Sequence, residues 1–137
     1  MRSAVLCYNL KGTEKGKKIG MIFGFLGYKV RHVETEEYGL PIGALAGIRE
    51  KENLEDTDTE CEYKGEGFPE EMMVISAATE EMLDKALFLM KKEKVQVDLK
   101  AVVTPTNQEW DSLSLYEEIK KEHLYMKQKE AERKQED

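Results

Sequence analysis

The sequence predicts a single α+β domain made of two similar halves. Each half runs from an apolar strand to a threonine, an amphipathic helix, a valine-led strand and a proline turn, and the halves are offset by about 65 residues. With 137 residues, of which 40% are hydrophobic, the chain has the length of one domain and can form one core. We therefore expect one domain over residues 1–126 and a polar tail over 127–137.

The first half begins with residues 3–10 (SAVLCYNL), a short apolar run that Lys11-Gly12 ends and that predicts a strand. Thr13 is a suitable N-cap for the helix that follows. One face of that helix is expected in the core, because apolar residues recur at the helical spacing i, i+3, i+4 and i+7. These residues are Ile19, Ile22, Phe23 and Leu26.

Gly27 stands where a residue with positive φ would stop that helix. Residues 30–34 (VRHVE) alternate between apolar and polar, which is typical of a half-exposed strand. Residues 41–47 are opened by proline and closed by glycine, and they predict one or two helical turns. Residues 49–71 then contain ten acidic residues and few apolar ones, which predicts a solvated connection.

The second half repeats the pattern, with a strand over residues 71–77 and Thr79 as the N-cap of the next helix. Its core stripe consists of Leu83, Ala86, Leu87 and Met90. Residues 99–104 predict the last strand, and a final helix starts near Ser112 or Ser114. Tyr116, Ile119, His123 and Met126 share one face of that helix, and the residues after it are polar and expected to fray.

The order β-α-β-β-α-β is the split βαβ pattern of ferredoxin-like folds. We therefore expect a four-stranded antiparallel sheet with two helices on one face and an added C-terminal helix. A doubly wound parallel sheet is the main alternative, but it needs a helix between the middle strands. The acidic residues 49–71 are too polar to supply that helix.

Charge and composition exclude several classes of function. The net charge is -7, which disfavours nucleic acid and anionic membranes as partners, because both are polyanions. The longest apolar stretch, residues 19–28, is about half the length of a membrane span of roughly 20 residues. Two cysteines and two histidines, spaced as they are, provide no metal site, and no cofactor motif is present. The sequence thus indicates a cytoplasmic protein without metal or cofactor.

One segment is similar to a known family. Residues 99–110 (LKAVVTPTNQEW), with Tyr116-Glu-Glu-Ile and Glu122-His123, resemble the bacterial domain of unknown function 3783. Tyr8-Asn9 and the segments 38–43 and 45–47 also resemble its pattern, so the resemblance extends from about residue 4 to 126. The resemblance implies a small cytoplasmic bacterial protein and draws attention to the turn at residues 104–107, but it carries over no catalytic role.

That turn, together with Tyr8, Asn9 and His123, is our candidate ligand site. The turn consists of Thr104, Pro105, Thr106 and Asn107, and its hydroxyl and amide groups suit a small anion such as a phosphate or carboxylate. Trp110 would provide an aromatic wall. Alternatively, Thr106 and Asn107 only hydrogen-bond the turn, Trp110 packs on the sheet, and His123 is a half-buried structural histidine.

Three glycines, Gly16, Gly20 and Gly24, line one face of the first helix. Each costs roughly 0.5–1 kcal/mol relative to alanine inside a helix, so a close approach of the sheet or of a partner helix is expected there. Apolar residues Met21, Phe25 and Tyr28 extend beyond the core stripe. This face is therefore our candidate for a homodimer contact.

Three functional hypotheses follow. The first is a non-enzymatic module that self-associates and binds a small ligand or a protein partner. The second is an enzyme that uses Tyr8, Asn9, Thr106, Asn107 and His123 on an anionic substrate, although no nucleophile-base pair is recognisable. The third is an adaptor whose acidic segment orders on a basic partner.

Overall fold

The computed structural model describes residues 3–47, 65 and 67–136. Most of the acidic segment that the sequence predicts as a connection, including Cys61, lies outside these residues. The described elements, in chain order, are β1 (Ala4–Tyr8), α1 (Glu14–Phe25), β2 (Lys29–His32), the 3₁₀ turn η1 (Thr35–Glu37), α2 (Ile42–Leu45), β3 (Met72–Ser76), α3 (Glu80–Lys92), β4 (Leu99–Val102), the 3₁₀ turn η3 (Asn107–Glu109) and α4 (Ser112–Glu136).

The helix starts follow the predicted caps. The amide of Gly16 donates to the Thr13 hydroxyl at 2.9 Å, and the amide of Met82 donates to the Thr79 hydroxyl at 3.2 Å. Each bond satisfies one of the amides that the first turn of a helix leaves without a partner. Gly27 has a φ of 90° just after α1, so the predicted stop is also confirmed.

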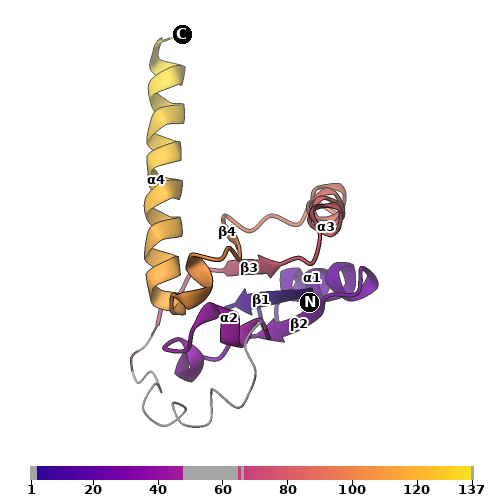
Figure 1. The fold of residues 1–137 in the computed structure, drawn as a ribbon. Helices are drawn as coiled ribbons and strands as arrows, with labels where there is room; N and C mark the ends of the chain where they lie inside the picture. The colour runs from indigo at the N-terminus through magenta and orange to yellow at the C-terminus, as the bar shows by residue number, and fades with distance from the viewer. Residues whose placement is uncertain (1–2, 48–64, 66, 137) are drawn as a thin grey trace.

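The sheet corrects the predicted topology, because it is mixed and not fully antiparallel. Its strand order is β2-β1-β3-β4 (Figure 1). β1 pairs in parallel with β2, and β3 pairs in parallel with β4, while the two central strands β1 and β3 run antiparallel. Each half of the chain is therefore a complete βαβ unit, whereas a ferredoxin-like sheet would insert a strand of one half into the other.

Burial on both faces explains the difference. β1 and β3 are buried at all five of their residues, and parallel pairs occur mainly where both faces of the sheet are covered. Val5 and Cys7 pack on one side with the inward faces of α1 and α3, and Leu6 and Tyr8 pack on the other side. A ferredoxin-like sheet would leave that second side open. Here α2, Phe68 and the first turns of α4 cover it.

The two halves correspond residue by residue. Cys7 pairs with His32 in the first half as Ile75 pairs with Val102 in the second. The following amides make the same bond in each half: Val33 donates to the carbonyl of Cys7 and Val103 to that of Ile75, both at 2.9 Å. The predicted internal repeat is therefore present in the fold, as two βαβ units joined through β1 and β3.

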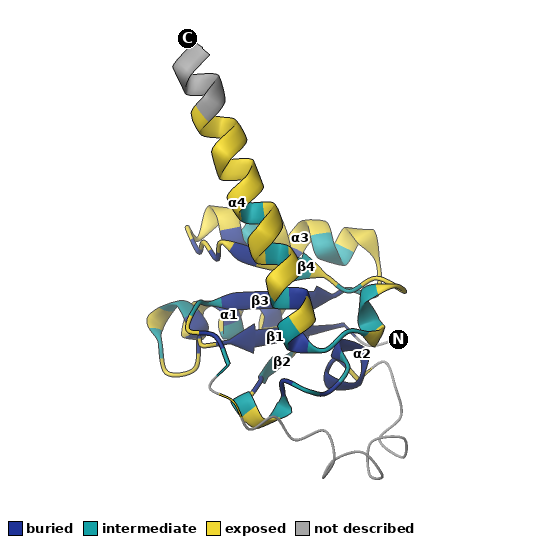
Figure 2. Cartoon of the chain, turned by 90° about the vertical axis from the view of Figure 1, so that its left-hand side faces the viewer, coloured by how far each residue is buried: buried dark blue, intermediate teal, exposed yellow. Residues whose placement is uncertain are grey.

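The C-terminal part of α4 extends away from the rest of the domain. Leu115 is buried, but Leu124, Tyr125 and Met126 are 56%, 58% and 66% exposed. Figure 2 shows α4 changing from buried and intermediate residues near the sheet to exposed ones as it extends away. The helix continues to Glu136, whereas the sequence predicted fraying after Met126.

Candidate functional site

The turn after β4 is held by its own side chains. The amide of Thr104 donates to Asn107 Oδ1 at 2.7 Å, and the amide of Asn107 donates to the Thr104 hydroxyl at 3.1 Å. Asn107 Nδ2 also donates to the carbonyl of Val102 at 3.0 Å. Thr106 is exposed. The Thr104 and Asn107 side chains are thus engaged within the turn, and a ligand role for the turn stays a prediction.

The first half contains a counterpart of this turn. Glu34 and Glu37 form a reciprocal capping box around η1, at the place after β2 that Thr104 and Asn107 occupy after β4. Because different side chains build the same turn in both halves, the reciprocal hydrogen bonding is a property of the fold.

Trp110 is half-buried against the second face of the sheet, and its carbonyl accepts from the amide of Ile42 at 2.8 Å.

Tyr8 belongs to an aromatic cluster under the start of α4. Its hydroxyl lies 2.7 Å from the Ser112 hydroxyl, and its ring contacts those of Tyr38 and Phe68 at centroid distances of 5.6 and 5.7 Å. Tyr116 stacks on Phe68 at 4.0 Å. Burial raises the pKa of the Tyr8 hydroxyl above its ordinary value, so this group is poorly suited to acid–base chemistry near neutral pH.

We expect the Tyr8→Phe substitution to destabilise the domain by about 1–3 kcal/mol, because it leaves the buried Ser112 hydroxyl without its partner. Adding Ser112→Ala should recover much of that loss, since both polar groups are then absent. Urea unfolding of the two single variants and the double variant measures this coupling. Additive losses in the double variant would contradict it.

Asn9 connects the end of β1 to the segment before β3. It has a φ of 59°, and its Nδ2 donates to the carbonyls of Phe68 and Glu70 at 2.7 and 2.8 Å. Asparagine tolerates this left-handed conformation better than most residues. Its side-chain amide therefore fixes the chain at residues 68–70.

The candidate ligand residues fall into two groups at opposite ends of the sheet. Tyr8 pairs with Met72, and Met72 pairs with Leu99, the first residue of β4. The turn at residues 104–107 follows the other end of β4. The structure therefore does not gather Tyr8, Asn9, Thr106 and Asn107 around one substrate.

His123 lies with the first of these groups, near the middle of α4. It lines a hollow of about 680 Å³ together with the charged residues Lys15, Glu70, Glu71, Asp98 and Lys120. Lys15 pairs with Glu71 at 3.1 Å, and Lys120 pairs with Glu70 at 3.0 Å. Both lysines of the hollow are already neutralised, so an anion entering it would compete with these carboxylates.

Glu70 also accepts a hydrogen bond from the Tyr116 hydroxyl. That bond, with a smaller contribution from Lys120, lowers the pKa of the Glu70 carboxyl from its ordinary value despite partial burial. A lowered carboxyl pKa adds stability above the unfolded-state value near 4.5, and this stability is lost as the pH falls through the folded-state value.

Glu70→Gln should therefore lower the stability at pH 7 and leave that at pH 3 nearly unchanged relative to the wild type. Urea midpoints of both proteins at the two pH values test this. An equal loss at pH 7 and pH 3 would show that the charge of Glu70 contributes nothing.

The three glycines of α1 have different surroundings. A Cβ on Gly16 would lie 2.1 Å from the carbonyl oxygen of Leu10, whereas Cβ atoms on Gly20 and Gly24 would meet nothing within 4 Å. Gly16 is therefore required by packing inside the chain. Gly20 and Gly24 leave two shallow gaps on the surface of α1.

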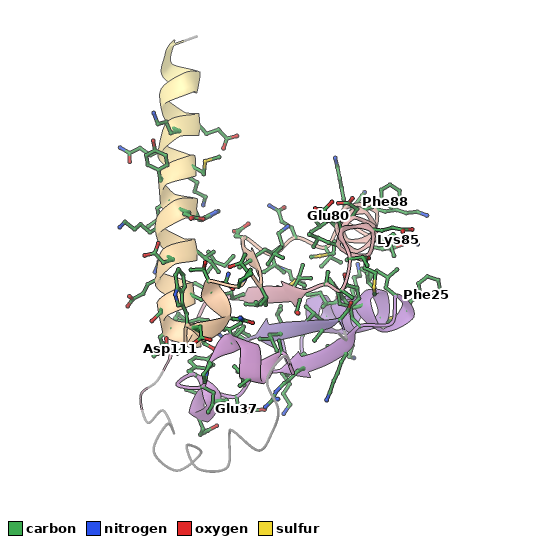
Figure 3. The ribbon with its side chains drawn as sticks, in the orientation of Figure 1. Phe25, Glu37, Glu80, Lys85, Phe88 and Asp111 are labelled. Atoms are coloured by element: carbon green, nitrogen blue, oxygen red, sulfur yellow. The ribbon has the colours of Figure 1, made fainter. Side chains whose placement is uncertain are left out.

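Large apolar side chains stand beside these gaps. Phe25 is 84% exposed and Met21 is 74% exposed on α1, and Phe88 is 65% exposed on α3. Figure 3 shows Phe25 and Phe88 pointing away from the sheet on the outer side of the two helices. Tyr28, which the sequence analysis placed on this surface, is instead 5% exposed and packs edge-on against Phe23.

A groove of about 340 Å³ runs between the two helices. Its walls are Met21, Ile22 and Phe25 from α1 and Leu89 from α3, with Lys18 and Glu93 as its charged members. We call the groove together with Phe88 the α1–α3 face. Exposed apolar surface of this kind, bordered by charges, is typical of a protein-binding surface.

Sequence reasoning found the α1 part of this face but missed α3. The helical spacing assigned Leu87 to the core, but Leu87 is 39% exposed and Phe88 more so. The signal was present in the run Ala86-Leu87-Phe88-Leu89-Met90, because five consecutive apolar residues cover more of a helix than one core stripe can bury.

The comparisons with known proteins bear on the second half of the chain. The geometry defines a four-stranded α+β domain built of two βαβ units with an apolar helix face. A family model described as Domain of unknown function (DUF3783) matches residues 71–126. The matched residues run from just before β3 into α4 and include the turn at residues 104–107. No curated protein and no solved structure matches the chain.

Two searches of the described residues were negative. None of the described helices is both long and apolar enough to cross a membrane. Within the same residues, no group of three or more histidine, cysteine, aspartate or glutamate side chains is arranged to hold a metal ion.

Proposed function

We propose that this domain is a non-enzymatic interaction module that pairs with a second copy of itself through the α1–α3 face. The observation that carries the proposal is the exposure of Phe25, which leaves 84% of a phenylalanine in water beside an apolar groove. Burying such a ring is worth about 1.5–3 kcal/mol, and aromatic and methionine side chains are enriched in interfaces.

The face suits a second copy because it carries both apolar side chains that project and an apolar groove that can receive them. Met21 and Phe25 are exposed at the edge of the groove. The face also has a cation and an anion, Lys18 and Glu93, in one groove. In a two-fold contact each residue meets a different residue of the same surface, so Phe25 can enter the groove of the second copy and Lys18 can meet Glu93 of the second copy.

The state of Cys7 fits an interaction module in the bacterial cytoplasm. Cys7 is a free cysteine, as is usual in the reducing cytoplasm. Its burial raises the pKa of the thiol to about 12, so it supplies no nucleophile. The adaptor hypothesis depends on the acidic segment, most of which lies outside the described residues, and no contact among the described residues favours it.

Sedimentation equilibrium of the wild type and two variants tests the proposal. We expect a wild-type dimer of twice the 15.8 kDa chain mass in the micromolar range. Phe25→Ala should weaken dimerisation about 30-fold or more, the effect of losing a central aromatic side chain worth about 2 kcal/mol.

The matched control is Met126→Ala, because Met126 is 66% exposed and lies on the projecting part of α4. This variant should dimerise like the wild type. A wild type that stays monomeric at several hundred micromolar would overturn the proposal. So would a dimer that Met126→Ala dissociates and Phe25→Ala does not.

A further inference from the structure

A second cavity opens at the carboxyl ends of the parallel strands β1 and β2. Its volume is about 330 Å³, and its polar lining comes from Asn9 and Lys11 after β1 and from His32, Glu34 and Thr35 around the end of β2. Small ligands commonly bind beyond the carboxyl ends of parallel strands, where the loops diverge. The volume suits a small metabolite.

The internal repeat shows which of these polar residues the fold requires. By register and chain order, the counterparts of Asn9, His32 and Thr35 in the second half are Ala77, Val102 and Pro105. The second half makes the same strand pair and the same following turn with these residues. His32 and Thr35 are therefore not needed to build the strand end, whereas Asn9 holds residues 68–70 through its side-chain amide.

His32 also has an unmet hydrogen bond. Its Nδ1 is buried and has no hydrogen-bond partner within the described part of the chain. A buried polar atom without a partner costs free energy. Val102, at the corresponding position of the second half, avoids that cost. A polar residue kept at such a site calls for an explanation beyond folding.

A cation at the mouth of the cavity is available to a ligand. Lys11 pairs with Glu34 at 3.1 Å, and the two side chains are 73% and 55% exposed. An ion pair this exposed contributes little to stability, so Lys11 can turn toward an anion at small cost. The donors around the cavity then outnumber the single carboxylate of Glu34.

We infer that this cavity binds a small metabolite through an oxyanion group, either a carboxylate or a phosphate. The His32 imidazole, the Lys11 ammonium and the Thr35 hydroxyl would donate to its oxygens. This site is distinct from the α1–α3 face and does not depend on the proposed self-association.

The test titrates the ¹⁵N-labelled full chain with sodium phosphate and, separately, with sodium acetate at constant ionic strength. The chain has two histidines, so His123 is an internal control for the His32 ring signals in the NMR spectrum. We expect the His32 ring and the amides of Lys11 and Thr35 to shift and saturate with at least one anion, while His123 does not move. Saturation with phosphate alone or acetate alone identifies the group bound.

Two variants separate binding from folding. His32→Val introduces the residue found at the corresponding position of the second half. It should keep or raise the melting temperature and weaken anion binding about tenfold or more, as measured from the NMR shifts of the Lys11 and Thr35 amides. Thr35→Val keeps the side-chain shape and should weaken binding in the same direction. Linear shifts that His123 shares, no shift with either anion, or unchanged binding by both variants would each overturn the inference.

Discussion

Phe23→Ala is expected to destabilise the domain by about 3–5 kcal/mol, the loss usually seen when a buried phenylalanine is truncated. Phe23 is fully buried between α1 and the sheet, and its ring packs edge-on against Tyr28 at a centroid distance of 4.8 Å. The alanine leaves a cavity in the core under α1 and α3. Thermal unfolding should shift down by about 10 °C or more for a domain of this size.

The control for this prediction stands two residues away. Phe25→Ala removes the same number of atoms from a side chain that is 84% exposed, so in dilute, monomeric protein its melting temperature should stay close to that of the wild type. If both variants lose similar stability, the assignment of Phe23 to the core and Phe25 to the surface is wrong.

Gly16→Ala is expected to lose about 1–3 kcal/mol, the usual cost of forcing extra atoms into packed structure. The added Cβ would lie 2.1 Å from the Leu10 carbonyl oxygen and 3.1 Å from the Thr13 hydroxyl that caps the helix. These contacts outweigh the roughly 0.5–1 kcal/mol that alanine otherwise adds inside a helix. Urea unfolding followed by circular dichroism measures the change.

Gly24→Ala provides the matched comparison within the same helix. Its Cβ meets nothing within 4 Å, so the helix preference acts alone and stability should rise by roughly 0.5–1 kcal/mol. A gain at Gly16, or a loss at Gly24 in the monomer, would contradict the description of how α1 packs.

Local sequence signals predicted the elements well because their physics is local. Thr13 and Thr79 cap their helices as expected, and Gly27 stops α1. The apolar runs of β1 and β3 also fell close to the observed strands. In each case neighbouring residues supply the interaction, so the sequence contains the whole cause.

The order of the strands in the sheet could not be predicted from such local signals. The ferredoxin-like sheet and the observed one both place β1 and β3 in the centre and the two less buried strands at the edges. They differ only in which edge each outer strand occupies. The useful signal was the unbroken apolar character of residues 4–8 and 72–75, because a sheet with one open face would alternate.

The candidate sites were predictable only in part. Met21 and Phe25 lie on one surface, as their spacing of four residues indicates, whereas Gly20 and Gly24 are not among the residues that line the groove. The polar residues at positions 8, 9, 106 and 107 were considered together, but strand pairing separates them. His32 was considered only with the other histidine and the cysteines, which provide no metal site, because its unmet hydrogen bond and the valine at the corresponding position of the second half become visible only in three dimensions.

The most direct test of the central claim is a dilution series of ¹³C-methyl-methionine NMR spectra on the unmodified chain. Met21 lies on the α1–α3 face, while Met126, similarly exposed, lies on the projecting part of α4. The account predicts that the Met21 methyl signal moves with protein concentration and that the Met126 signal does not. A Met21 signal that stays fixed up to millimolar protein, or a Met126 signal that moves in its place, would contradict it.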